Sequence, residues 1–133
     1  MSDIMKFVIL GAGNIGTLIG AKLAQLDSSE VLIHTRGEHA ASLAVNGISV
    51  DGVETFHLAA NKYHISISDV EINSVFDGLA DYIFITSKAG NVEELLQLAK
   101  RFVKTSTKII ILSNGLGHIA VSYTHLRAHE TSR

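Results

Sequence analysis

Short runs dominated by apolar residues divide the chain at regular intervals. Four of them occupy residues 7–10, 30–35, 81–86 and 108–112. Runs of this length with little polar alternation are typical of strands that are buried on both faces of a parallel sheet. A fifth run, residues 64–68, alternates polar and apolar side chains and predicts another strand.

Apolar residues recur at helical spacing between these strands. A helix that begins at Asn14 is predicted to bury one apolar stripe against the sheet. The stripe consists of Ile15, Leu18, Ile19, Leu23 and Leu26. Residues 38–45 predict a shorter helix, which ends at Asn46 and Gly47 because these residue types readily adopt the left-handed conformation.

A third helix is predicted after the strand at residues 81–86. Asn91 is a suitable N-cap residue, and Glu94, three residues later, is its capping-box partner. The apolar face of this helix consists of Val92, Leu95, Leu96, Ala99, Phe102 and Val103.

The middle of the chain carries a weaker pattern. Residues 48–50 and 53–58 predict a β-hairpin on a two-residue turn, Asp51 and Gly52. Residues 69–80 predict only a helical turn or two.

The alternation of strands and helices predicts one α/β domain over residues 1–120, with a doubly wound parallel sheet of the Rossmann-like kind. The net charge of the 133-residue chain, −2, gives no electrostatic reason to bind nucleic acid or an anionic membrane. The chain has no cysteine, and no apolar run reaches the length of about 18 residues that a membrane helix needs. We therefore expect a cytoplasmic protein with neither of these partners.

The strand at residues 7–10 leads directly into a Gly-x-Gly-x-x-Gly motif at the start of the first helix. The motif consists of Gly11, Ala12, Gly13, Asn14, Ile15 and Gly16. In dinucleotide sites the first glycine permits a tight turn, the second lets the backbone approach a pyrophosphate, and the third lets helix and strand pack closely. The helix start adds free N–H groups and a partial positive charge. The context predicts a dinucleotide site, although glycines that serve the turn alone would produce the same pattern.

The second strand ends at Thr35 and is followed by Arg36. Sites that prefer NAD usually carry an acidic residue here, which bonds the ribose 2′-hydroxyl. A guanidinium can instead bind a 2′-phosphate through charge-assisted hydrogen bonds. This favours NADP (NADPH) as the cofactor over NAD, the alternative being an ordinary surface arginine.

Two more polar residues follow later strands. Lys88 comes after the strand at residues 81–86, and Asn114 comes after the strand at residues 108–112. Ligands of doubly wound sheets bind beyond the carboxyl ends of the strands, so both residues are candidates for the nicotinamide side of the cofactor. From spacing alone, a solvated lysine and a turn-forming asparagine are equally good interpretations.

Taken together, the glycine motif and these strand ends resemble the N-terminal domain of the ketopantoate reductases (2-dehydropantoate 2-reductases). The more specific parts are Ser87-Lys88-Ala89 and Asn114-Gly115-Leu116-Gly117. The resemblance implies that Arg36 binds the 2′-phosphate. It also implies that Lys88 and Asn114 face the nicotinamide and the substrate.

The resemblance further implies NADPH-dependent reduction of ketopantoate to pantoate, a step toward pantothenate and coenzyme A. In that family the general acid is a lysine of a helical C-terminal domain, which we expect to be absent from this chain, so that no catalytic residue lies in it and it is inactive alone. Two alternatives stay open. One is an NADP-dependent reductase of another 2-oxo acid, and the other is a non-catalytic nucleotide-sensing domain, which would usually keep an acidic residue at the end of the second strand.

Residues 121–133 differ in character from the rest. Residues 121–131 resemble a translated sequencing adapter of the transposon-inserted kind, so we expect a foreign, unstructured tail and a natural protein that continues differently after Ala120. His125 and His129, four residues apart, could mimic a metal pair, but a third ligand is missing and we expect no metal.

Overall fold

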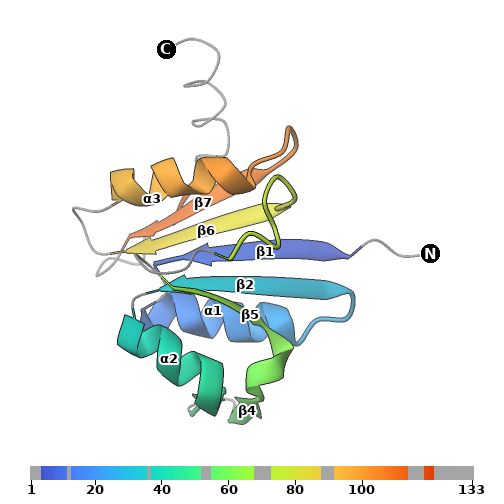
Figure 1. Cartoon of the computed structure of the whole chain (residues 1–133), viewed down its shortest axis with the longest axis vertical. Helices are drawn as coiled ribbons and strands as arrows, with labels where there is room; N and C mark the ends of the chain where they lie inside the picture. The colour runs from blue at the N-terminus through green and yellow to red at the C-terminus, as the bar shows by residue number, and fades with distance from the viewer. Residues whose placement is uncertain are drawn as a thin grey trace.

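A computed structural model describes residues 4–11, 13–35, 37–51, 55–67, 73–87, 92–113 and 119–121 (Figure 1). The strands are β1 (Met5–Leu10), β2 (Ser29–Thr35), β3 (Ile48–Val50), β4 (Phe56–Leu58), β5 (His64–Ile67), β6 (Tyr82–Ser87), β7 (Lys108–Ser113) and β8 (Ile119–Val121). The helices are α1 (Asn14–Ala24), α2 (Gly37–Asn46) and α3 (Val92–Ala99), with short 3-10 helices η1 (Ala60–Lys62) and η2 (Lys100–Phe102).

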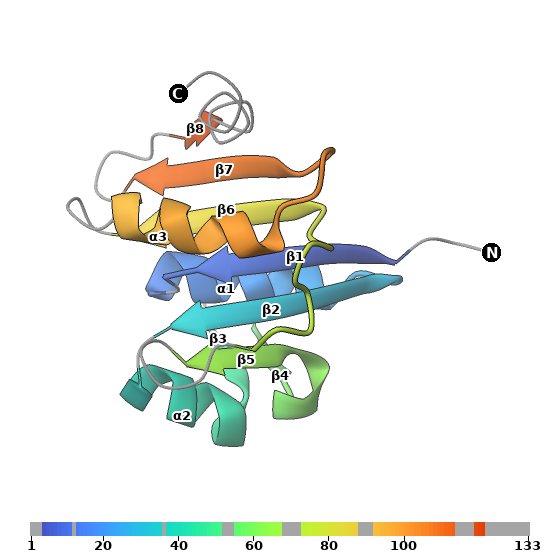
Figure 2. The same ribbon diagram turned by 45° about the horizontal axis from the view of Figure 1, so that its top comes forward.

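The main sheet has the order β5-β2-β1-β6-β7-β8. The first five of these strands are parallel, and β8 joins β7 in the antiparallel direction. The order reverses between β1 and β6, so the chain winds outward in both directions from this point (Figure 2). The predicted doubly wound parallel sheet is confirmed.

The central strand β1 is buried on both faces, as its apolar sequence predicts. Val8 and Leu10 belong to the core on the α3 side of the sheet, whereas Phe7 and Ile9 belong to the core on the α1 side. The two helices lie on opposite faces of the sheet (Figures 1 and 2). An uninterrupted apolar run is therefore needed, because successive side chains enter two different cores.

The predicted buried stripe of α1 is confirmed only in part: Ile19 and Leu23 pack against the core on this side of the sheet, and the other three residues are exposed. Ile15 and Leu18 are 48% and 42% exposed, and Leu26 beyond the helix is 54% exposed. The residues of α1 that are buried are instead small: Gly16, Gly20 and Ala21.

Close packing explains why α1 presents its small face to the sheet. A Cβ atom on Gly20 would lie 3.1 Å from Cδ1 of Ile33 and 3.5 Å from Cγ1 of Ile9. The helix backbone thus rests directly on side chains of β1 and β2, where large residues would not fit. Ile15 and Leu18 lie on the outer side, whereas Ile19 and Leu23 are partly buried against the core.

The hairpin is confirmed, but its predicted two-residue turn is wrong. The β3–β4 register pairs Val50 with Phe56 and Ile48 with Leu58, so five residues connect the strands. A two-residue turn would instead place Thr55 opposite Ile48. The observed register puts the buried Ile48 and Leu58 side by side, and burial of one face determines register in a short hairpin.

The predicted end of α2 and the predicted apolar face of α3 agree with the structure. Gly47 follows α2 with φ +76°, which confirms the predicted left-handed stop. The predicted apolar face of α3 is confirmed, because Leu95, Ala99 and Phe102 are buried in the core on that side of the sheet. Asn91, the predicted N-cap, lies outside the described residues.

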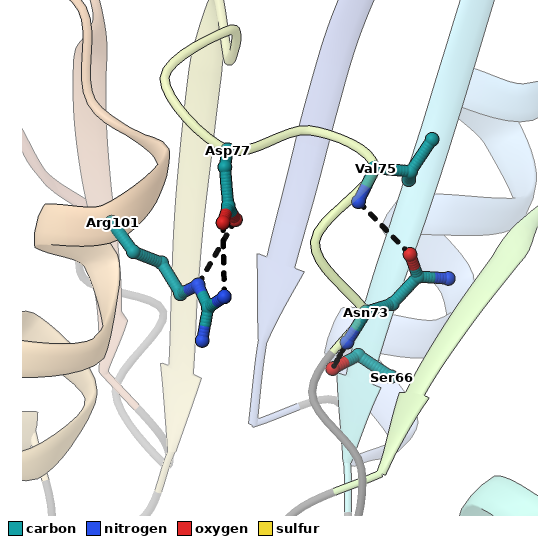
Figure 3. Close-up of polar contacts among 5 residues, drawn as sticks. All are labelled: Ser66, Asn73, Val75, Asp77 and Arg101. Carbon is teal, nitrogen blue, oxygen red and sulfur yellow. Dashed lines mark hydrogen bonds and ion pairs between the residues drawn. The ribbon is translucent and has the colours of Figure 1, made fainter.

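The connection from β5 to β6 crosses the α3 face and is held by polar contacts (Figure 3). Ser66 Oγ accepts a hydrogen bond from the Asn73 N–H (3.0 Å), and Asn73 Oδ1 accepts one from the Val75 N–H (3.0 Å). Arg101 donates two hydrogen bonds of 2.9 Å to the Asp77 carboxylate. Between these anchors the chain forms the expected short turns, while residues 68–72 lie outside the described part.

The far end of the described chain forms a strand, β8, that the sequence pattern did not predict. Val121, the first residue of the predicted tail, is the last residue of β8 and pairs with Ile110. The expectation that the tail is unstructured from this residue onward is therefore wrong at Val121, and residues 122–133 lie outside the described part. No helix within the described ranges is long and apolar enough to cross a membrane.

Asp81 joins three strands at the amino-terminal edge of the sheet. Its carboxylate accepts a hydrogen bond from the Lys6 N–H (2.8 Å) and forms an ion pair with Lys104 Nζ (2.7 Å). Its backbone N–H donates to the Lys6 carbonyl, and its carbonyl accepts from the Lys108 N–H. Burial by itself raises the pKa of this carboxyl, but the hydrogen bonds and charges of Lys104 and Lys6 outweigh it and lower the pKa below the ordinary value. The ionised form thus stabilises the folded state.

We expect Asp81→Asn to lower the free energy of unfolding by about 1–2 kcal/mol at neutral pH, since it removes charge-assisted bonds at a partly screened site. Because the folded-state pKa is depressed, this contribution is fully present above the unfolded pKa, near 3.8, and is lost as the pH falls through the folded value. Urea denaturation at a series of pH values should show the gap between wild type and variant closing below about pH 4. Asp27→Asn, in the exposed turn before β2, is the control, and a gap that stays constant down to the lowest pH would contradict the role of Asp81.

Candidate functional site

The carboxyl ends of the parallel strands meet at one edge of the sheet. The arrowheads of β1, β2, β6 and β7 point to this edge, and α1, α2 and α3 all begin there (Figures 1 and 2). The strand order reverses between β1 and β6, and ligands of open α/β sheets bind at such a switch point. The glycine motif follows β1 at this position.

Gly11 occupies a crowded position at the end of β1. Its φ is +77°, and an added Cβ would lie 2.7 Å from the backbone oxygen of Thr86 and 2.8 Å from Cδ1 of Leu95. Its N–H donates to the His34 carbonyl (2.9 Å), and its own carbonyl accepts from Thr86 Oγ1 (3.1 Å). Gly11 is therefore required by the tight turn and by the close approach of β6 and α3.

Gly13 occupies the opposite kind of environment. It is the exposed N-cap of α1, and a Cβ added to it would meet no atom of the described residues within 4 Å. No side chain caps the helix at this residue, whose carbonyl accepts the Thr17 N–H (2.9 Å). The side-chain direction of Gly13 is thus unobstructed by the described residues, which suits a backbone that a phosphate group approaches closely.

The remaining motif residues fit the same arrangement. Gly16 is buried, in agreement with the predicted helix–strand packing, and Ile15 is exposed at the site. Asn14 begins α1, and Ala12 lies outside the described residues.

The predicted strand-end residues can be located only in part. Thr35 is the buried last residue of β2 and pairs with Ile67 of β5. Arg36, Lys88 and Asn114 lie outside the described residues. The β6–β7 register pairs Ser87 with Ser113, so the strands that lead to Lys88 and Asn114 end side by side.

One contact at this edge has no counterpart in the sequence predictions. Thr17 Oγ1 in the first turn of α1 and His39 Nε2 in the first turn of α2 lie 3.1 Å apart and share a hydrogen bond. The two residues are 22 positions apart in the sequence, and no rule of helix or strand spacing connects positions that far apart. The sequence feature that could have indicated this contact is the β-α-β-α order, because it brings the starts of α1 and α2 to the same edge of the sheet.

The part of the chain that the structure describes holds no group of three His, Asp or Glu side chains that could bind a metal ion. His125 and His129 lie outside it. The site as described is thus built from backbone groups and uncharged side chains at the start of α1.

Comparison with known proteins identifies the family. The sequence model of the ketopantoate reductases, PanE/ApbA, matches residues 7–130. The chain belongs to the ketopantoate reductase family. A 2-dehydropantoate 2-reductase from Pyrococcus horikoshii is 31% identical over 114 residues, which are 86% of this chain and 34% of that protein. One from Streptococcus pyogenes is 27% identical over 127 residues, 94% of this chain and 38% of that protein.

Solved structures share the fold. The 2-dehydropantoate 2-reductase of Geobacter metallireducens has a TM-score of 0.66 at 23% identity, over 96% of this chain and 38% of that one. D-mandelate dehydrogenase with NADH and anilino(oxo)acetate has a TM-score of 0.64 at 25% identity, over 86% of this chain and 35% of that one. The chain therefore spans a little over a third of the length of these relatives.

Membership of the ketopantoate reductase family implies a nicotinamide dinucleotide as the cofactor. The geometry fits such a group, because no described residue fills the space that a side chain of Gly13 would occupy at the start of α1. In this chain the candidate ligand position, Gly13, and the crowded turn, Gly11, are thus two residues apart.

We expect Gly13→Val and Gly11→Ala to fail in different ways. The side chain of Gly13→Val projects into open space, so the melting temperature should stay near that of the wild type while dinucleotide binding is lost. Gly11→Ala places a methyl group against a backbone oxygen in a left-handed conformation and should lower stability by about 2–4 kcal/mol. Calorimetric titration and thermal melts test both variants. Undiminished binding by folded Gly13→Val would mean that the loop is only a turn.

Proposed function

We propose that this chain is the NADP-binding part of a 2-dehydropantoate 2-reductase, which reduces ketopantoate to pantoate with NADPH. The observation that carries the proposal is the uncapped, open N-terminus of α1 at Gly13, located at the switch point of the sheet. Family membership supports the same assignment. The pyrophosphate would bind the N–H groups of the first turn of α1.

The preference for NADPH rests on the end of β2. Thr35 is the last residue of this strand and Arg36 follows it, so neither position has the carboxylate that would repel a 2′-phosphate. A guanidinium presents paired N–H donors that match phosphate oxygens. We assign Arg36 to the 2′-phosphate.

The nicotinamide side is assigned to residues that follow β6 and β7. These strands end side by side at Ser87 and Ser113, and Lys88 and Asn114 are the next residues in the sequence. Both side chains can donate hydrogen bonds to a carbonyl or carboxylate oxygen and so orient a 2-oxo acid. The bound cofactor supplies the hydride, and a protonated group must supply the proton for the alkoxide. We assign that group to the part of the family's proteins that this chain does not span, because the family resemblance places a lysine of a helical domain in this role.

A second candidate is a reductase that prefers NADH and acts on a different 2-oxo acid. It is favoured by the likeness to D-mandelate dehydrogenase, whose structure holds NADH and anilino(oxo)acetate. Turnover of the full-length protein with ketopantoate and with benzoylformate, each with NADPH and NADH, separates the two candidates. Faster turnover of benzoylformate with NADH would overturn the proposed function.

We expect Arg36→Ala to weaken NADPH binding by about tenfold or more, since hydrogen bonds to charged groups contribute about 1.5–3 kcal/mol. NADH, which has no 2′-phosphate, should bind almost as before. Arg101→Ala is the matched control, because Arg101 is paired with Asp77 at the far end of α3. Calorimetric dissociation constants for both cofactors provide the measurement, and equal weakening of NADPH and NADH would remove Arg36 from this role.

A further inference from the structure

The hydrogen bond between Thr17 and His39 joins the two halves of the proposed cofactor site. Thr17 lies one turn after Gly13, and its N–H is bonded to the Gly13 carbonyl, so it moves with the pyrophosphate-binding turn. His39 is the third residue of α2, the helix that begins directly after the strand end assigned to the ribose 2′ position. The 3.1 Å contact between Thr17 Oγ1 and His39 Nε2 connects these two turns.

The surroundings of the Thr17–His39 hydrogen bond favour a stable connection between α1 and α2. Both side chains are partly buried, so water competes for the bond less than at an exposed site. The threonine hydroxyl can donate to an unprotonated Nε2 or accept from a protonated one, so the bond forms with either neutral tautomer of the imidazole. Threonine is also restricted at χ1, which limits the positions its hydroxyl can take.

We infer that His39 is a positioning residue for NADPH: through Thr17 it holds the start of α2 at a set distance from the start of α1. This inference rests on the proposed function: the end of β2 has no carboxylate for the 2′-hydroxyl of NADH, so the 2′-phosphate of NADPH is the group that must engage Arg36 while the pyrophosphate engages the start of α1. NADH needs the pyrophosphate turn but makes no phosphate contact after β2. A ligand such as 2′-AMP needs only the 2′-phosphate contact after β2. Its affinity should therefore not depend on the distance between the starts of α1 and α2.

The test measures dissociation constants of NADPH, NADH and 2′-AMP by calorimetry. His39→Ala and Thr17→Val each remove the bond and should weaken NADPH by about three- to tenfold. The double variant should be no weaker than the single ones, because both remove the same interaction. NADH and 2′-AMP should change by less than about twofold, the range expected when no direct contact is lost.

Two conservative variants and one control variant distinguish loss of the hydrogen bond from a general effect of substitution. His39→Gln places an amide near the position of Nε2, and Thr17→Ser keeps the hydroxyl; both should restore most of the NADPH affinity. His57→Ala is the matched control, because His57 Nδ1 bonds Ser49 Oγ at 2.8 Å in the β3–β4 hairpin. That bond is a similar one on a different element, and its loss should leave all three affinities unchanged.

The outcomes separate this inference from the proposed function. Tight NADPH binding by the wild type with no effect of His39→Ala or Thr17→Val would overturn the inference and leave the proposed function standing. Equal weakening of 2′-AMP and NADPH would make His39 a direct phosphate ligand and would also overturn it. Wild-type protein that does not prefer NADPH to NADH would overturn both.

Discussion

The close approach of three elements at the end of β1 is the constraint on which the rest of the structure depends. Gly11 turns the chain between the end of β6 and α3, and it has room for no side chain. Hydrogen bonds with the His34 carbonyl and the Thr86 hydroxyl tie this turn to both neighbouring strands. The direction in which α1 leaves the sheet, and with it the open N-cap at Gly13, follows from this turn.

A second close approach continues the first along α1. Gly20 lets the helix backbone rest on Ile33 and Ile9, so α1 lies nearer to the sheet than a helix with a leucine-rich inner face could. Close contact of the helix backbone with these side chains adds to the partial burial of Ile19 and Leu23 against the same core. Ile15 and Leu18 are consequently exposed on the outer side of the helix.

The polar contacts at the amino-terminal edge of the sheet stabilise the fold, whereas the carboxyl edge carries the candidate site. At the amino-terminal edge, the Asp81 carboxylate binds the Lys6 N–H and the Lys104 ammonium group, and the Asp81 backbone bonds Lys6 and Lys108, so that β1, β6 and β7 are tied together. The carboxyl edge, where all three helices begin, has the free backbone groups of helix starts, which is the arrangement that ligand binding in this family of folds requires. The Thr17–His39 bond is a side-chain link at this second edge, and we assign it to the organisation of the proposed cofactor site.

Much of the fold and the outline of the candidate site could be predicted from the sequence by itself, because they depend on local pattern. Apolar runs predicted the strands of the parallel sheet, and the left-handed stop at Gly47 was readable from its residue types. The strand-turn-helix context of the glycine motif likewise predicted the position of the site. The tertiary structure alone decided which face of α1 is buried, because that choice depends on the surface formed by Ile9 and Ile33. It also decided the hairpin register, which follows from burying Ile48 beside Leu58, and the pairing of Thr17 with His39, which requires two helix starts to meet in space.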